Sequence, residues 1–109
     1  MVEIAYYERN GKCPVREYIR GKEEKTREKI ISYISILRRF GSSLGMPYVK
    51  KVEDKIFELR VEYAGNNHRL FYFFWIEKRI VFVHAVDKKK QKLDRVDIET
   101  AIRRMREIV

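Results

Sequence analysis

The sequence is poor in the residue types that build disulfide-bonded and metal-binding proteins. Cys13 is the only cysteine, so an intrachain disulfide and a cysteine-based zinc site are both excluded. The two histidines, His68 and His84, lie far apart in the chain, and neither belongs to an HxxxH or clustered-carboxylate pattern. We therefore expect no metal ion and no cofactor.

Long apolar runs and common catalytic motifs are also missing. The most apolar run, Leu70–Ile76, is far shorter than the roughly 18 residues that a membrane-spanning helix needs. There is no glycine-rich phosphate loop and no nucleophile elbow, which excludes the usual nucleotide-binding and hydrolase classes. The absence of a signal peptide and the single cysteine predict a cytoplasmic protein without a membrane anchor.

Positive charge is what the chain has in excess. Its 109 residues include 25 Lys+Arg and 16 Asp+Glu, which gives a net charge of +9. Such an excess favours a polyanionic partner, namely RNA, DNA, a ribosome or an acidic protein, although it also fits a protein that is merely soluble. The length and the 45% of hydrophobic residues predict one globular domain over residues 1–109.

Three consecutive segments in the second half of the chain have the patterns of β-strands. Ile56–Tyr63 alternates apolar and charged residues, Leu70–Ile76 is apolar on both faces, and Arg79–Val86 is rich in Val, Ile and Phe. Ala64–Asn67 contains Gly and Asn and predicts the turn between the first two strands. Glu77–Lys78 is the predicted link between the next two.

The remaining segments predict helices around this sheet. Val2–Tyr7 has the composition of an edge strand, Val15–Ile19 predicts a short helix, and Lys22–Phe40 predicts a long one. The long helix has an apolar stripe formed by Ile30, Tyr33, Ile34, Leu37 and Phe40. Gly41–Lys55 is predicted to be a loop that touches the sheet only briefly, and Arg95–Glu107 to be the C-terminal helix. We therefore predict an α+β fold, with helices from both ends of the chain packed on a mostly antiparallel, twisted sheet of about four strands.

Basic residues lie within these strands and directly after them. Arg60 belongs to the first strand and Arg69 begins the most apolar one, so we expect the two to converge on one face of the sheet. His84 lies in the third strand. A block of lysines follows that strand: Lys88, Lys89, Lys90 and Lys92.

This set of residues suits RNA cleavage without a metal ion. In that reaction the 2′-hydroxyl group attacks the neighbouring phosphate, so the protein must supply a proton acceptor, a proton donor and cations for the developing charge. The guanidinium fork of arginine matches phosphate oxygens, which suits Arg60 and Arg69. Histidine titrates nearest physiological pH, so His84 could move a proton.

Structural interpretations exist for the same residues. Arg60 alternates with Glu58 and Glu62, which predicts a surface ion-pair ladder as well as it predicts a phosphate clamp. Arg69 begins the most hydrophobic strand, where an unpaired charge would be costly, and this favours a functional role.

His84 and the lysine block have structural alternatives as well. In a regular strand His84 shares a face with Ile80, Phe82 and Val86, which is typical of a half-buried structural histidine. The lysine block is either a solvated turn or a contact for RNA. We assign no role to His68, which lies next to the predicted turn.

Five short motifs occur in an order that resembles the RelE/HigB-like toxins of type II toxin–antitoxin systems. The resemblance is closest to the phage-related, HigB-type branch, and it extends over nearly the whole chain. The motifs are Pro14–Tyr18, Gly45–Lys51, Phe57–Arg60, Arg69–Tyr72 and His84–Lys89.

The resemblance implies a compact fold like that of microbial RNases and cleavage of mRNA in the ribosomal A site. It also implies neutralisation by a cognate antitoxin, often a helix-turn-helix protein. Arg60 and Arg69 match cationic positions on the catalytic strands of these toxins, and Lys88 or Lys89 matches the basic residue after the last core strand. The chain departs from some RelE-type members in having Glu58 in place of a lysine and no tyrosine within Lys90–Arg95.

The resulting hypothesis is a toxin that acts as an mRNA endoribonuclease on ribosome-bound message. Its predicted partners are a cognate antitoxin, the ribosome and mRNA, and its predicted catalytic residues are Arg60, Arg69, His84 and Lys89. The predicted RNA-binding residues are Lys88, Lys90, Lys92 and Arg95. The alternative is a non-catalytic regulator on the same fold that binds nucleic acid or protein.

Overall fold

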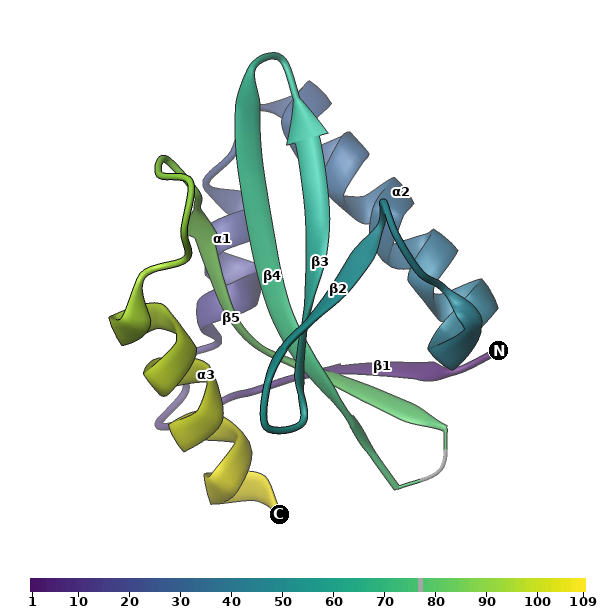
Figure 1. The fold of residues 1–109 in the computed structure, drawn as a ribbon, viewed down its shortest axis with the longest axis vertical. Helices are drawn as coiled ribbons and strands as arrows, with labels where there is room; N and C mark the ends of the chain where they lie inside the picture. The colour runs from purple at the N-terminus through teal and green to yellow at the C-terminus, as the bar shows by residue number, and fades with distance from the viewer. Residues whose placement is uncertain (77) are drawn as a thin grey trace.

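The computed structural model describes residues 1–76 and 78–109 and has an α+β fold (Figure 1). Its elements in chain order are β1 (Glu3–Tyr6), α1 (Pro14–Arg20), α2 (Glu24–Phe40), the 3-10 turn η1 (Gly41–Ser43), β2 (Val49–Glu53), β3 (Ile56–Tyr63), β4 (Asn66–Trp75), β5 (Arg79–Asp87) and α3 (Arg95–Ile108). The predicted α+β class is therefore confirmed. Among the described residues, no helix combines the length and the apolar character needed to cross a bilayer.

The sheet has five strands in the order β1-β5-β4-β3-β2. The pairs β2–β3, β3–β4 and β4–β5 are antiparallel, whereas β1 runs parallel to β5. The prediction of about four strands was wrong. The sheet is mixed because no hairpin joins β1 to β5: two helices and three strands separate them in the chain, and they pair in parallel.

The additional strand is β2, which lies in the segment predicted to be a loop. Val49 is buried, but Lys50 and Lys51 follow it and are exposed, so the segment lacks the period-two pattern of a half-buried strand. Lysines are typical of strands at the edge of a sheet, where they discourage pairing with other chains. β1 forms the opposite edge, as its composition predicts.

A tight turn sets the register of the central hairpin. Ala64 and Gly65 alone link β3 to β4, and both have positive φ angles, of 51° and 78°. This conformation is typical of two-residue hairpin turns. β4 therefore begins earlier than predicted, and Arg69 lies inside it, directly opposite Arg60. The predicted link at Glu77–Lys78 includes residue 77, which lies outside the described residues.

Helices cover the two faces of the sheet unequally (Figure 1). α1 and α2 pack on one face, whereas α3 lies on the other face beside β4 and β5. Ile30, Ile34 and Leu37 of the predicted stripe are buried, which confirms it, but Phe40 is 52% exposed because the helix ends there. Among the residues that the structure describes, no helix covers the part of the α3 face nearer the β3–β4 turn.

A β-bulge changes the side to which His84 points. Phe71 pairs with His84 and Tyr72 with Phe82, so Val83 is an extra residue in β5. Bulges re-aim the side chains that follow them. His84 consequently stacks on Phe71, on the α3 face, and the prediction that it shares a face with Ile80 and Phe82 was wrong.

Candidate active site

A glutamate lies between the two arginines of the central hairpin. Arg60 and Arg69 are paired across β3 and β4, and strand alternation places Glu58 on the same face, the one that carries α3. Arg60 Nε lies 3.7 Å from Glu58 Oε1, and Arg69 Nε lies 3.7 Å from Glu58 Oε2. The predicted convergence of the arginines is confirmed. Arg60 pairs with Glu58, as the alternative interpretation expects, but Glu58 is buried, so this pair is not part of a surface ladder.

The three side chains differ in their access to solvent. Glu58 is 5% exposed and Arg69 is 1% exposed, whereas the side chain of Arg60 is 21% exposed. Arg69 donates to the His68 main-chain carbonyl at 3.1 Å and approaches Glu62 to 3.7 Å. Burial lowers the pKa of Arg69, and the nearby Glu58 opposes that change. Arg60 is therefore the arginine that an incoming ligand meets first.

Several atoms in the row formed by Arg60, Glu58 and Arg69 are buried and lack a hydrogen-bond partner. Within the described part of the chain these are Glu58 Oε2, Arg60 Nε and Arg69 Nε. Buried polar atoms usually have a partner, because leaving one unpaired is costly. These atoms keep unused hydrogen-bonding capacity, although none of the three is in contact with solvent in this arrangement.

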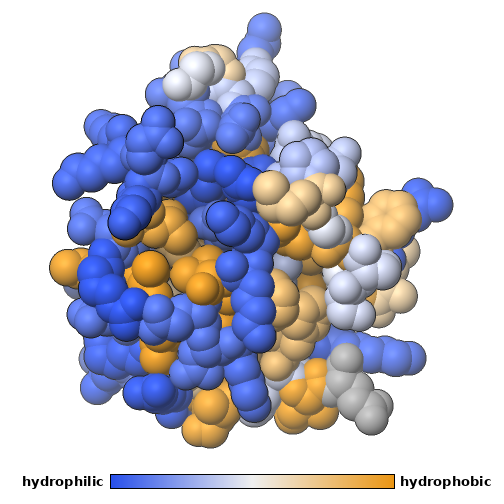
Figure 2. All heavy atoms as spheres, viewed as in Figure 1, coloured by the Kyte–Doolittle hydropathy of each residue, from blue (hydrophilic) through white to orange (hydrophobic). Residues whose placement is uncertain are grey.

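The lysine block leaves the sheet next to the arginine pair. Val86 pairs with Arg69, and the Lys88 N–H donates to the Asn67 carbonyl at 2.7 Å, which fixes the start of the block. Lys88 is half-buried, and the other lysines, Lys89, Lys90 and Lys92, are exposed. Hydrophilic residues dominate this upper left part of the surface in Figure 2.

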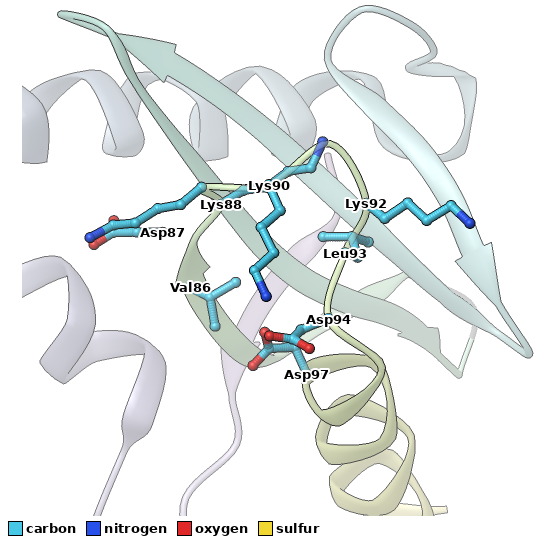
Figure 3. A pocket seen from close by; sticks show the side chains of 9 residues that line it. Val86, Asp87, Lys88, Lys90, Lys92, Leu93, Asp94 and Asp97 are labelled. Atoms are coloured by element: carbon cyan, nitrogen blue, oxygen red, sulfur yellow. The ribbon is translucent and has the colours of Figure 1, made fainter.

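A pocket of about 240 Å³ separates the lysine block from the start of α3 (Figure 3). It is lined by Val86, Asp87, Lys88, Lys89, Lys90, Lys92, Leu93, Asp94 and Asp97. The Lys90 side chain extends toward Asp94 and Asp97, whereas the Lys92 side chain points away from them. The pocket thus offers both cationic donors and carboxylate acceptors.

His84 has a partner at each ring nitrogen. Its Nε2 lies 2.8 Å from Asp97 Oδ1, and its Nδ1 lies 3.3 Å from Arg104 Nη1. Burial lowers the pKa of His84, and the hydrogen bond to Asp97 opposes that change. This geometry is typical of a structural histidine, and the role of His84 in proton transfer stays a prediction.

Arg95 is also held by carboxylates. It donates to both oxygens of Glu53, at 2.5 and 2.8 Å, and to Glu99 at 3.2 Å. The hydrogen bond to Glu53 is the main reason why the pKa of Arg95 is raised. Arg95 therefore ties α3 to β2, and its contact with RNA stays a prediction.

Glu58 is the residue whose position the sequence interpretation undervalued. Its alternation with Arg60 suggested only a neutralising partner, but the two-residue turn brings Arg69 to its other side. Recognising Ala64–Gly65 as the whole turn would have fixed this register.

Among the described residues, no group of three or more His, Cys, Asp or Glu side chains could hold a metal ion.

Comparison with known proteins assigns the chain to a family. A comparison with curated proteins found no match. The profile of the family described as "Phage derived protein Gp49-like (DUF891)" matches residues 17–106, which include all the strands of the candidate site and most of the helices. The family is associated with the toxins of toxin–antitoxin systems. The chain therefore belongs to the Gp49-like (DUF891) family of phage-derived proteins.

Proposed function

We propose that this protein is a toxin of the RelE/HigB type that cleaves ribosome-bound mRNA without a metal ion. The observation that carries the proposal is the row Arg60–Glu58–Arg69 on one sheet face, with a block of four lysines leaving the neighbouring strand opposite Arg69. A proton acceptor and a cation thus lie together, next to cations suited to an RNA backbone.

Each member of the row has a distinct role in the proposed reaction. Glu58 accepts the proton of the 2′-hydroxyl, whose oxygen then bonds to phosphorus while the bond to the 5′-oxygen breaks. Arg60 stabilises the charge that develops on the phosphate oxygens. Arg69 is too buried to reach the phosphate first, so it acts by orienting Glu58.

The lysine block supplies the remaining groups. Lys89 donates a proton to the departing 5′-oxygen, while Lys88, Lys90 and Lys92 hold the RNA backbone.

The same cationic surface would be covered by an acidic segment of a cognate antitoxin, because opposite charges favour association. In this proposal the ribosome presents the message to the site.

Growth arrest on induction in a bacterial host tests the proposal. Arg60→Ala should abolish the arrest without unfolding the protein, because the Arg60 side chain is partly exposed. Lys55→Ala, in the exposed β2–β3 turn, is the control and should remain toxic. Arg69→Ala is a poorer choice, because removing one partner of a buried ion pair costs about 3–5 kcal/mol.

Two outcomes would count against the proposal. Full toxicity of Arg60→Ala would exclude its role at the phosphate. A folded wild-type protein that causes no arrest would instead support the alternative, a non-catalytic binding regulator.

A further inference from the structure

A second cluster of ionisable side chains lies on the opposite face of the sheet from the arginine row. Tyr18 of α1, His68 of β4 and Asp87 of β5 meet there: the Tyr18 hydroxyl donates to Asp87 Oδ1 at 2.5 Å and lies 2.6 Å from His68 Nδ1. Lys22 Nζ donates to both oxygens of Asp87, at 3.1 and 3.2 Å. The proposed reaction uses none of the three clustered side chains.

The hydrogen bonds define which nitrogen of His68 carries a proton. The Tyr18 proton is donated to the Asp87 carboxylate, so the Tyr18 oxygen is free to accept the proton of His68 Nδ1. Asp87 Oδ1 also lies 3.1 Å from Nδ1 and can stabilise the ring when it is charged. The other nitrogen, Nε2, is buried, and within the described part of the chain it has no hydrogen-bond partner.

His68 is only 3% exposed, yet it lines the pocket of about 710 Å³ on this side of the molecule. The other lining residues are Gly21, Lys22, Glu23, Thr26, Gly65, Asn66, Asn67, Asp87, Lys88 and Lys89. Three of them are lysines and two, Glu23 and Asp87, are acidic, with Asp87 paired to Lys22. Thr26, Asn66 and Asn67 add neutral hydrogen-bond donors.

The N-terminus of α2 borders the same pocket. The first main-chain hydrogen bond of this helix runs from the Arg27 N–H to the Glu23 carbonyl, so the N–H groups of the residues between them point out of the helix end. A helix of 17 residues with its N-terminus beside lysines is a favourable place for an anion. The buried, unpartnered His68 Nε2 can donate to that anion once the ring is protonated.

From this arrangement we propose that the pocket formed by His68, Lys22, Lys88, Lys89 and the first turn of α2 binds a phosphate group of an RNA backbone. Lys88 and Lys89 line both this pocket and the smaller one beside α3. One RNA strand can therefore cross the sheet edge at the lysine block, with one phosphate near Arg60 and another at α2. The identity of the polyanion as RNA rests on the proposed function, whereas the phosphate site itself does not.

Bound phosphate requires His68 to donate from Nε2, so binding should be accompanied by protonation of the ring. The charged and titratable groups around this ring are Tyr18 of α1, Lys22 and Glu23 between α1 and α2, and Asp87 with the lysines after β5. The charge of Arg69, whose side chain lies on the other face of β4, also acts on the ring. Sulfate is the better probe, because it remains a dianion at neutral and mildly acidic pH.

An NMR titration of the full chain with sulfate tests the site. We expect saturable shifts at the amides of Glu24–Thr26 and Lys88–Lys89 and at His68 Nε2, with tighter binding at about pH 6 than at about pH 8. His68→Asn keeps a donor at the Nδ1 position and removes Nε2, and it should weaken binding about tenfold or more. Non-saturating shifts, or unchanged affinity in a folded His68→Asn variant, would overturn the proposal.

A second pair of variants keeps the test valid if His68→Asn does not fold. Lys89 lines the pocket and Lys92 does not, although both are exposed members of the same lysine block. Lys89→Gln should therefore weaken sulfate binding while Lys92→Gln leaves it unchanged, and equal effects would contradict the site.

The His68→Asn variant separates this inference from the proposed function, because His68 has no role in the proposed reaction. In this variant, affinity for a non-cleavable, 2′-deoxy oligonucleotide should fall in parallel with sulfate affinity. Sulfate binding without any mRNA cleavage would retain the site and reject the nuclease, whereas cleavage without sulfate binding would do the reverse.

Discussion

Glu58 is held by two arginines while one of its carboxylate oxygens has no hydrogen-bond partner among the described residues. If Glu58 accepts the proton of the 2′-hydroxyl through Oε1, the oxygen beside the partly exposed Arg60, Glu58→Gln should lower cleavage by about 10²- to 10⁴-fold. The amide has the same shape but leaves the buried Arg69 charge without that partner, so the variant should be less stable than wild type while remaining folded. Single-turnover cleavage on programmed ribosomes, with circular dichroism as the folding control, measures both effects; wild-type cleavage by Glu58→Gln would remove the carboxylate from the mechanism.

The two histidines link the stability of the fold to pH. Burial lowers the pKa of both His68 and His84 from the ordinary value of 6.5. The unfolded chain therefore binds more protons than the folded one as the pH falls below about 6.5, so the folded state loses stability there. We expect the free energy of unfolding in urea to fall between about pH 7.5 and pH 5.5.

A variant assigns that decrease to the histidines. Asp87 also has a lowered pKa, because hydrogen bonds from Tyr18 and Lys22 outweigh the effect of its burial, but its ordinary value of 3.8 is outside this pH range. His84→Gln should therefore show a shallower decrease than wild type. An identical pH profile would mean that His84 titrates alike in the folded and unfolded chains.

Individual elements differ in how far their sequence predicts them. β3 and the apolar stripe of α2 have clear periodicity and were predicted, whereas β2 was missed because paired lysines interrupt its pattern. The bulge at Val83 leaves no mark on the sequence, since β5 is apolar on both faces and a one-residue shift changes no burial preference. His68 was overlooked because β4 begins before the predicted turn ends.

The site was predicted only where it follows from strand adjacency. Arg60 and Arg69 lie on neighbouring strands, so their convergence could be expected from the sequence alone. The contacts of His84 with Asp97 and of Arg95 with Glu53 depend on how α3 packs against the sheet, which no short-range pattern encodes. The catalytic and RNA-binding roles of these residues stay predictions.

Packing of α2 on the sheet should account for a large share of the stability. Ile30 is fully buried, whereas its neighbour Ile31 is 50% exposed. Ile30→Ala should lower the free energy of unfolding by about 2–5 kcal/mol, because it removes buried methyl groups and leaves a cavity. Ile31→Ala is the matched control and should change stability by less than about 0.5 kcal/mol. Urea unfolding of both variants measures the difference, and equal losses would contradict the observed helix orientation.

Over the whole molecule, the net positive charge and the incomplete cover of the sheet by α3 together leave a cationic surface open to a partner. The chain has a net charge of +9, and α3 leaves uncovered the part of its sheet face near the β3–β4 turn, where the arginine row lies. A cationic surface of this kind attracts any polyanion, so charge alone does not distinguish a nuclease from a binding protein. The distinction depends on the chemistry of Glu58 and Arg60.

Mapping of 5′ ends on a translated message, after induction of the protein in a bacterial host, tests the nuclease most directly. Ribosome-dependent cleavage predicts new ends in phase with codons, which are absent when translation initiation on that message is blocked and absent in Arg60→Ala. Growth arrest without new ends, or ends that persist in Arg60→Ala, would contradict the proposed mechanism.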